Sequence, residues 1–467
     1  MIHKFSLFLV VFCSLLALSA HGQEKQKEKP PQGGEPKDFT LPKKEVVTLD
    51  NGLTLVMVPY GAIPKATIRF SIKTGNIDEK ENQVWLSDLL ADLMEEGSTT
   101  RTAQQIADEM AGMGGNLNIG VGPHTTSISS SVLYEYAPKA IALMADVLIN
   151  PKWPAEELDR LKNDMKRNLA VQLARPQAQA SSEFFAAIYP DHPYGRIFPT
   201  DTMIDSYSVE DIKQFYGENF GAKRTTIYVV GSFDAEGVKK AVETSLSNWK
   251  EGTPADYSVA EPVVANEVKI IDRPGAPQST IFYGLPVAAD PSNEDYIALD
   301  ITNSILGGSF ASRITSNIRE DKGYTYSPRS ILDANYKSGV WYEVADVTTE
   351  HTGASLEEIQ KEIKKLQDEP PSPEEMEGII NYESGLFVLQ NSTPNGIIGQ
   401  LIFLDTHDLE ESFLTSKVEN MHAVTPKMVQ EMTQKYIKPG NMTLIVVGDK
   451  DKIETQIEET VQKPLKQ

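Results

Sequence analysis

The chain has 467 residues, with 44 Lys and Arg against 66 Asp and Glu, which gives a formal net charge of −22. Such an acidic balance argues against a nucleic-acid partner, because phosphate binding requires clustered basic side chains. The length exceeds what a single hydrophobic core usually organises, so two or more domains are expected.

The N-terminus, residues 1–22, has the pattern of a secretory signal peptide. Lys4 supplies a positive charge, residues 5–18 form an apolar run too short to span a bilayer, and small residues close the segment. The single cysteine, Cys13, falls inside it, so we expect a mature protein without disulfides or cysteine ligands. Residues 23–41 are rich in Lys, Glu, Pro and Gly and are predicted to form a flexible charged leader. These features predict a soluble periplasmic protein of a bacterium, without a membrane anchor.

Two patterns open the folded part of the chain. Residues 46–56 contain two β-prone runs around Asn51-Gly52, which is the signature of a β-hairpin. Residues 85–99 place leucines at positions 86, 89, 90 and 93, the spacing of one buried helical stripe. Asp88 and Asp92 lie one turn apart on the opposite face, beside Ala91. Composition alone therefore predicts a surface helix with a solvated acidic face.

An internal repeat divides the chain into two similar halves. Residues 208–231 and 425–448 each begin with Ser or Thr at a helix start and end, 23 residues later, in Val-Val-Gly. Each segment is followed by a further helical pattern. We predict two α+β domains, residues 42–250 and 268–467, joined by a Pro-containing linker over residues 251–267.

A glycine-rich stretch followed by charged residues marks the second half. Gly307-Gly308 breaks the helical pattern, which resumes at Ile314 and ends in charged residues. Gly323 is expected to cap that helix, and an alternating strand is predicted to begin at Tyr324.

No other hydrolase or nucleotide-binding signature is present. The seven histidines form no His-x-x-x-His pair, and the sequence contains no P-loop, dinucleotide fingerprint or Gly-x-Ser-x-Gly motif. His124 and His192 stand next to turn residues and are predicted to be exposed loop histidines.

The order and spacing of these patterns resemble the M16 (pitrilysin or insulinase) peptidases over about residues 44–462. The resemblance implies an α+β fold of two tandem homologous domains, each an antiparallel-rich sheet packed with helices, which together form half of a clamshell. In M16 enzymes the zinc helix carries His-x-x-Glu-His before a Gly-Thr or Gly-Ser turn, which Gly97-Ser98 matches here.

Aligned on that turn, the chemistry of the zinc helix is replaced throughout. The two zinc histidines fall on Asp88 and Asp92, and the catalytic glutamate falls on Ala91. The third ligand, a glutamate on a charged helix, falls on Asn168. We call these four positions the degenerate zinc site, and the resemblance implies that this chain holds no zinc. The oxygens of Asp88, Asp92 and Asn168 also suit a harder cation such as Ca²⁺ or Mg²⁺, an alternative that the sequence leaves open.

Arg319 and Tyr326, seven residues apart, match an arginine and tyrosine that competent M16 enzymes use to contact substrate at the zinc. Arg can donate to a substrate carbonyl, and a Tyr hydroxyl can donate to a developing oxyanion. The resemblance thus implies an exported, non-catalytic, peptide-binding subunit of a heterodimeric zinc endopeptidase, inactive alone. Its partner would supply His-x-x-Glu-His and the zinc. The alternative is a peptidase-derived peptide-binding or scaffold protein with no catalytic role.

Overall fold

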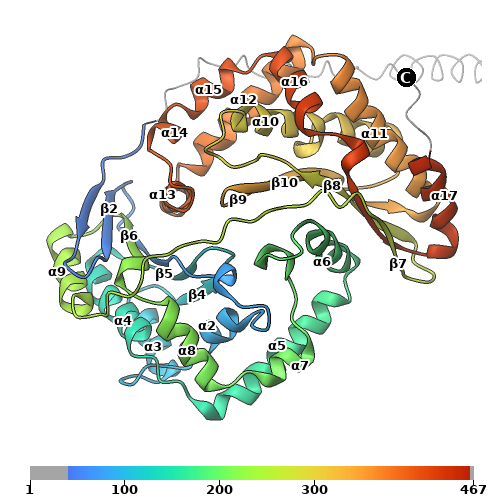
Figure 1. Ribbon diagram of the computed structural model, residues 1–467. Helices are drawn as coiled ribbons and strands as arrows, with labels where there is room; N and C mark the ends of the chain where they lie inside the picture. The colour runs from blue at the N-terminus through green and yellow to red at the C-terminus, as the bar shows by residue number, and fades with distance from the viewer. Residues whose placement is uncertain (1–39, 463–467) are drawn as a thin grey trace, which may run out of the picture. The chain divides into compact units, whose positions relative to one another are not determined.

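The computed structural model describes residues 40–462, which build two β-sheets with helices packed on them (Figure 1). The signal peptide and nearly all of the leader that the sequence predicts lie outside the described residues. Within the described part of the chain, no helix is both long and apolar enough to cross a membrane.

The two sheets differ by one strand. The first has six strands in the order β1-β2-β6-β3-β5-β4, and the second has five in the order β7-β11-β8-β10-β9. The strands of the first sheet are β1 (Glu45–Thr48), β2 (Thr54–Pro59), β3 (Lys65–Ile72), β4 (Asn118–Val121), β5 (Thr126–Leu133) and β6 (Thr225–Gly231). Those of the second sheet are β7 (Val268–Asp272), β8 (Gln278–Pro286), β9 (Arg329–Asn335), β10 (Ser338–Thr348) and β11 (Thr443–Gly448).

Both halves are rich in helix. The helices of the first half are α2 (Leu86–Glu95), α3 (Ala103–Gly112), α4 (Ala137–Ile149), α5 (Ala155–Leu173), α6 (Pro176–Ile188), α7 (Asp201–Ser206), α8 (Val209–Asn219) and α9 (Ala235–Leu246). Those of the second half are α10 (Tyr296–Asn303), α11 (Thr352–Asp368), α12 (Pro373–Gln390), α13 (Pro394–Thr406), α14 (Ser412–Thr415), α15 (Lys417–Ala423), α16 (Pro426–Tyr436) and α17 (Lys450–Gln462).

The two sheets share one topology, which explains the internal repeat. β2 pairs in parallel with β6 in the first sheet, as β7 does with β11 in the second. Each sheet then continues through three antiparallel pairings, β6-β3-β5-β4 and β11-β8-β10-β9. The repeated segments are α8-β6-α9 and α16-β11-α17, and the Ser208 and Thr425 side chains cap their first helices. The predicted α+β class with two homologous units is therefore confirmed.

The extra strand of the first sheet comes from the predicted hairpin. β1 and β2 pair in antiparallel register around Asn51-Gly52, and Gly52 has a φ of 90°. A side chain is disfavoured in that backbone conformation, so glycine suits the turn.

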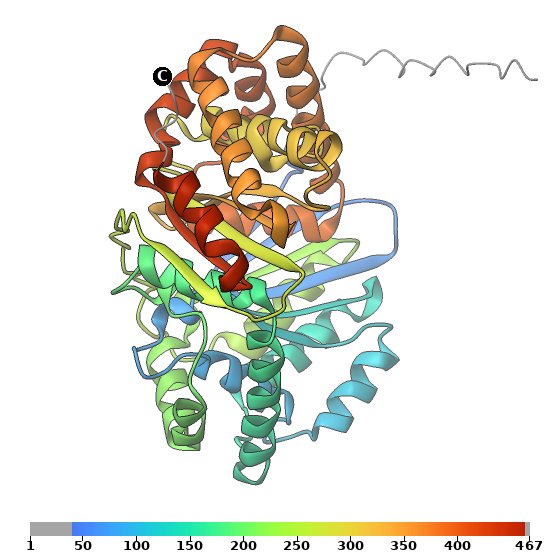
Figure 2. The same cartoon turned by 90° about the vertical axis from the view of Figure 1, so that its right-hand side faces the viewer.

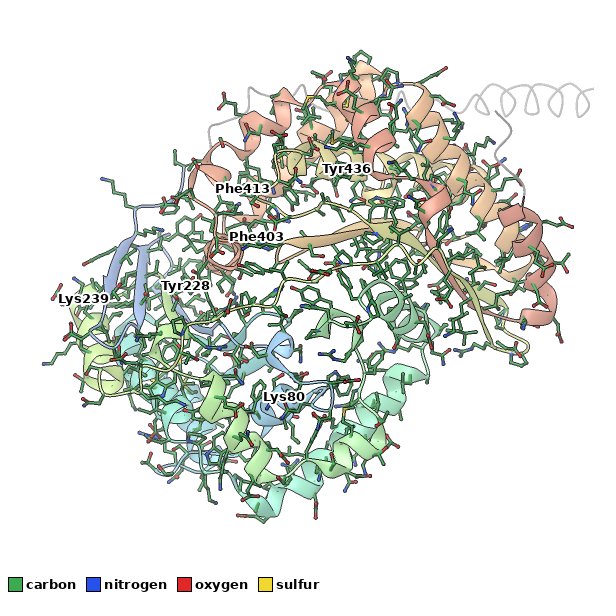
Figure 3. The ribbon with its side chains drawn as sticks, viewed as in Figure 1. Lys80, Tyr228, Lys239, Phe403, Phe413 and Tyr436 are labelled. Carbon is green, nitrogen blue, oxygen red and sulfur yellow. The ribbon has the colours of Figure 1, made fainter. Side chains whose placement is uncertain are left out.

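Each half contributes one helix to the sheet of the other half. α13 of the second half covers one face of the first sheet, where Ile397, Ile398 and Leu401 pack on Val58 and Tyr228. In Figure 3, Tyr228 lies close to α13, which carries Phe403.

In the reverse direction, α6 of the first half packs on the second sheet, where Phe184 contacts Phe282 and Tyr342. Burying large apolar side chains contributes about 1.5–3 kcal/mol each, so this exchange holds the two halves together. Most other helices of the halves lie on the outer sides of the two sheets (Figures 1 and 2).

The segment that carries Arg319 differs from the sequence prediction. Two π-helical segments, Ser304–Gly308 and Thr315–Asp321, replace the regular helix ends expected there. Gly323 has a φ of 67° and its N–H donates to the Arg319 carbonyl at 3.1 Å, which confirms the glycine cap.

The predicted strand begins later, at Arg329 rather than at Tyr324. The residues between Gly323 and Arg329 do not form a β-ladder. Two of them, Tyr324 and Thr325, are instead hydrogen-bonded to the end of β10. The Thr348 N–H donates to the Tyr324 carbonyl at 3.0 Å, and Thr325 Oγ1 donates to the Asp346 carbonyl at 2.7 Å. Tyr326, just beyond, is left exposed.

Beneath the first π-helical segment lies a buried acid, Glu343 of β10. The residue is fully buried, and neither carboxylate oxygen makes a hydrogen bond of normal geometry with the described residues. A Cβ atom added to Gly307 would lie 2.7 Å from Glu343 Oε2, so only glycine fits above the carboxyl group. Burial raises the pKa of Glu343 well above its ordinary value, partly offset by the backbone N–H and the charge of Arg329.

The parent protein should lose stability as the pH rises because of Glu343, and the Glu343→Gln variant should not show this loss. Because the pKa of Glu343 is raised in the folded state, its stabilising contribution is complete at acid pH and declines once the unfolded chain ionises. Urea unfolding at a series of pH values from about 5 upward should show the variant gaining stability on the parent as the pH rises, by up to about 1 kcal/mol per pH unit. The exposed Glu350→Gln serves as control. Parallel pH profiles for parent and Glu343→Gln would contradict this reading.

Candidate functional site

The predicted apolar stripe of α2 is confirmed, and a buried glutamate fixes where the helix begins. Leu86, Leu89, Leu90 and Leu93 are all 0% exposed. Glu79 accepts hydrogen bonds from the backbone N–H groups of Trp85 at 3.0 Å and Ser87 at 2.9 Å. These bonds satisfy donors that a helix start otherwise leaves free.

The turn that contains Glu79 is itself held in place. The N–H groups of Asn76 and Ile77 donate to the backbone of the β4–β5 turn, and Arg224 Nη1 lies 2.9 Å from Asp78 Oδ1. Burial raises the pKa of Glu79 to about 7. The hydrogen bonds from Ser87 and Trp85 lower the pKa but only partly offset the effect of burial. Sequence reasoning missed this residue, because Glu79 lies outside the positions of a capping box and no local pattern marks it.

The predicted solvated face of α2 is wrong for Asp88. Its carboxylate is half-buried and accepts a hydrogen bond from Asn76 Nδ2 at 2.9 Å, and burial raises its pKa. The reason is long-range, because the turn at Asn76–Asp78 covers this end of the helix. Ala91 is 5% exposed, so the helix has no space for a larger side chain there without rearrangement.

Asp92 does reach solvent, as predicted, yet it sits among acids. Partial burial, followed by the negative charges of Glu95 and Asp88, raises the pKa of Asp92 to about 6, while Arg160 acts in the opposite direction. The charge of this carboxylate therefore changes close to neutral pH.

Asn168, the fourth position of the degenerate zinc site, lies on α5. That helix packs against α2 through its buried face, which includes Met165 and Leu169, and Arg160 forms an ion pair with Glu96 at the end of α2. Asn168 itself is exposed and makes no hydrogen bond to Asp88 or Asp92. Among residues 40–462 there is no group of three or more His, Cys, Asp or Glu residues arranged to hold a metal ion.

A free strand edge borders α2. β4 pairs only with β5 among the described strands, so its other edge has no β partner. The Ile119 N–H on β4 donates instead to Glu95 Oε1 at 3.2 Å. An open edge can accept an extended peptide as an added strand, once such a side-chain bond gives way.

Arg319 lies between two exposed aromatic rings. Its guanidinium carbon is 4.4 Å from the ring centre of Phe310 and 4.9 Å from that of Tyr326. Phe310 is 65% exposed and Tyr326 is 79% exposed, and the Tyr326 hydroxyl bonds to no described residue. We call these three residues the Arg319 stack. No hydrogen bond or ion pair within the described part joins the stack to the degenerate zinc site.

The two histidines predicted to be exposed are covered instead. His192 is 8% exposed and its Nε2 lies 2.8 Å from Ser258 Oγ. His124 is half-buried, with Nε2 at 2.6 Å from the Tyr194 hydroxyl, and the Tyr257 hydroxyl donates to its carbonyl. The segment between the sheets, which contains Tyr257 and Ser258, folds over both turns, and no local pattern could have revealed this.

The half-buried His124 should make stability depend on pH below neutrality. Burial, followed by the charges of His407 and His192, lowers the pKa of His124 from 6.5 to about 4. Below pH 6.5, His124 therefore binds a proton in the unfolded chain but stays neutral in the folded chain. The free energy of unfolding decreases as the pH falls through this range.

We expect His124→Gln to reduce that loss by about 1 kcal/mol near pH 5.5, measured by thermal or urea unfolding against a reference near pH 7.5. His422→Gln, at an exposed position, is the matched control. If the parent and His124→Gln lose stability in parallel on acidification, the imidazole of His124 is not the group responsible.

Two family models match the chain in tandem. The model described as "Insulinase (Peptidase family M16)" matches residues 56–200, and the model described as "Peptidase M16 inactive domain" matches residues 206–382. The chain belongs to the M16 peptidase family. The α2 helix falls within the first match and the Arg319 stack within the second.

Relatives within the M16 family carry names of both kinds, peptidase and non-peptidase. An "Uncharacterized zinc protease" of Rickettsia bellii is 25% identical over 69% of this chain and 78% of its own length. "Non-peptidase homolog YmxG" of Helicobacter pylori is 20% identical over 84% of this chain and 90% of its own. The crystal structure of a peptidase M16 inactive domain from Pseudomonas fluorescens superposes with a TM-score of 0.78 at 22% identity, covering 87% of this chain and 98% of that one. This likeness establishes the fold alone.

Proposed function

We propose that this M16 protein is the non-catalytic, substrate-binding subunit of a heterodimeric zinc endopeptidase. A partner chain would supply His-x-x-Glu-His, the zinc and the general base, and this chain would supply the Arg319 stack. The observation that carries the proposal is an asymmetry within one chain. The positions for zinc chemistry hold Asp88, Ala91, Asp92 and Asn168, whereas the half-buried Arg319 stacks on the exposed Tyr326, whose hydroxyl bonds to no described residue.

The Arg319 stack offers hydrogen-bond donors of the kind that stabilise the transition state of peptide hydrolysis. A guanidinium held between two rings loses rotational freedom before substrate arrives, so less entropy is lost when it binds a carbonyl. Tyr326 is 79% exposed, and its hydroxyl can donate a hydrogen bond to an oxyanion that forms at the partner's zinc. The free edge of β4 offers a place for an extended peptide backbone.

A location outside the cytoplasm is part of the proposal. The sequence pattern of residues 1–22 favours export to a bacterial periplasm, and the partner is expected to carry a similar export signal.

A second function, peptide binding or scaffolding without any peptidase role, is favoured by the name of the Helicobacter pylori relative, "Non-peptidase homolog YmxG". Under that reading the Arg319 stack contributes only to the local structure.

Assembly separates the two proposals. The purified chain is mixed with a candidate partner, an exported His-x-x-Glu-His protein of similar length sought in the neighbouring reading frames, and the mixture is followed by size-exclusion chromatography with light scattering. The subunit proposal predicts a one-to-one complex that survives dilution to micromolar concentration, which corresponds to about −8 kcal/mol of binding free energy. Independent elution of the two proteins would favour the scaffold function instead.

A further inference from the structure

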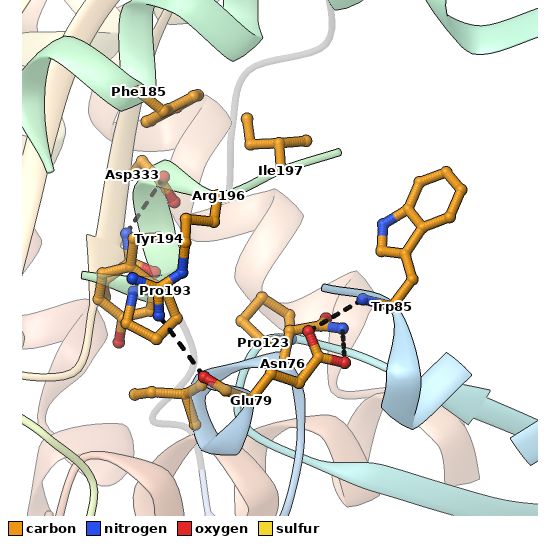
Figure 4. A pocket seen from close by; sticks show the side chains of 12 residues that line it. Asn76, Glu79, Trp85, Pro123, Phe185, Pro193, Tyr194, Arg196, Ile197 and Asp333 are labelled. Carbon is orange, nitrogen blue, oxygen red and sulfur yellow. Dashed lines mark hydrogen bonds between the residues drawn. The ribbon is translucent and has the colours of Figure 1, made fainter. Parts of the chain in front are cut away.

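A pocket of about 280 Å³ lies where turns of the first half meet strand β9 of the second half (Figure 4). Residues next to α2, from α6 and the segment after it, and from β9 line it. No residue of the degenerate zinc site or of the Arg319 stack is among them. The pocket adjoins the degenerate zinc site, because Asn76 lines it and also donates to Asp88, but it contains none of the four positions of that site.

The walls of the pocket are mainly apolar and aromatic. Trp85, Phe185 and Ile197 line it together with two prolines, Pro123 and Pro193. Trp85 is braced by Phe198, whose ring centre lies 5.8 Å away in an edge-on arrangement. Ligand sites commonly combine such walls with a few polar groups, and this volume is that of a ligand about the size of one amino acid.

One cation in the pocket lacks a counter-ion. Arg196 forms no ion pair with any residue in the described ranges, and the only hydrogen bond of its guanidinium there is a long one, 3.5 Å from Nη2 to the Glu79 carbonyl (Figure 4). Its remaining N–H groups are therefore available. A guanidinium binds a planar carboxylate through two parallel hydrogen bonds, and the contact strengthens where the site is partly shielded from water.

The acids of the pocket restrict the charge of the ligand. The Glu79 carboxylate is engaged by Trp85 and Ser87, so it does not compete for Arg196. Asp333 accepts a hydrogen bond from Asn335 Nδ2 at 3.3 Å, and burial raises its pKa. A doubly charged phosphate would be repelled by Asp333 more strongly than a single carboxylate, which fits the Arg196 guanidinium that has no ion-pair partner among the described residues.

We propose that this pocket binds a monocarboxylate with an apolar or aromatic body, its carboxylate on Arg196 and its body against Trp85 and Phe185. A free N-acylated amino acid and the C-terminal residue of a peptide share this chemistry. The inference goes beyond the proposed function, because all the residues belong to this chain and neither the partner nor zinc is needed.

Isothermal titration of the full chain tests the pocket with N-acetyl-L-phenylalanine as probe. The acid should bind with a dissociation constant of about 1 mM, and N-acetyl-L-phenylalaninamide, which lacks the charge, at least about tenfold more weakly. Arg196→Met should weaken binding of the acid by about 10- to 100-fold, the usual effect of losing a charge-assisted pair. Arg175→Met, at an exposed arginine outside the pocket, is the matched control and should bind normally.

Asp333→Asn provides a second, opposite test. Removing the neighbouring negative charge should tighten binding of the acid, whereas a site for an amine would be weakened by the same change. A pentapeptide that ends in a free Phe carboxylate is compared with its C-terminal amide to distinguish a peptide end from a free acid as the ligand. Binding of either the pentapeptide acid or N-acetyl-L-phenylalanine supports the proposal. Absence of saturation of the parent by any of these acids at about 10 mM, equal binding of acid and amide, or full binding to a folded Arg196→Met variant would overturn it.

Discussion

Replacing Tyr326 by Phe in the assembled heterodimer should lower peptidase turnover by about 100-fold while leaving assembly intact, the effect of losing one oxyanion donor. The substitution removes only a hydroxyl that bonds to no described residue, and the ring that stacks on Arg319 remains. The loss should therefore appear in kcat, with little change in the melting temperature or in KM. Arg319→Ala should lower kcat/KM by a similar factor, because a charge-assisted hydrogen bond to substrate is lost.

Controls separate a contact with substrate from a local structural effect. Tyr382→Phe removes a hydroxyl from another partly exposed tyrosine and should leave turnover unchanged. Phe310→Ala removes one side of the Arg319 stack while keeping both hydrogen-bond donors, so its effect should be smaller than that of Arg319→Ala. Normal turnover in both Tyr326→Phe and Arg319→Ala complexes would exclude a role for the stack in the reaction.

Restoring three ligands should give the chain a zinc ion. The variant Asp88→His, Asp92→His, Asn168→Glu is expected to retain about one zinc per chain after dialysis, where the parent retains none. Positions 88 and 92 lie one turn apart on α2, and α5 packs against the same helix. Ala91 is left unchanged, because a glutamate there would have to displace its buried surroundings. Metal content is measured by atomic emission and geometry by cobalt substitution spectra.

The matched control keeps Asn168 and carries only the two histidines. With two ligands in place of three, it should lose most of its zinc in the same dialysis. Equal metal content in the parent and the triple variant would contradict the alignment that places the degenerate zinc site at these positions.

Local patterns in the sequence were sufficient for the elements with strong periodicity or turn chemistry. The leucine stripe of α2, the Asn51-Gly52 hairpin and the repeated helix and strand around Gly231 and Gly448 all follow from neighbours along the chain. These features sufficed to establish the fold class, because a repeated unit folds the same way twice.

What the sequence could not predict depends on contacts between distant segments. Asp88 is covered by a turn twelve residues earlier, and His192 is covered by Ser258 from the segment between the sheets. The exchange of α6 and α13 between the halves also has no local signal, since an apolar helix face does not specify which sheet it covers.

The segment that carries Arg319 was also predicted only in part from the sequence. Its charged residues predicted a helix end, and the glycine cap is present at Gly323. The π-helical form of Thr315–Asp321 has no local signal, and neither has the preceding segment Ser304–Gly308, whose Gly307 packs over Glu343 of β10.

The central claim, a divided peptidase, is tested most directly by measuring cleavage of a quenched unfolded peptide together with zinc content. The chain alone, its His-x-x-Glu-His neighbour alone and their mixture are compared under identical conditions. The account predicts that only the mixture cleaves the peptide and that zinc resides in the neighbour. Zinc-dependent cleavage by this chain alone, or full activity of the neighbour alone, would contradict it.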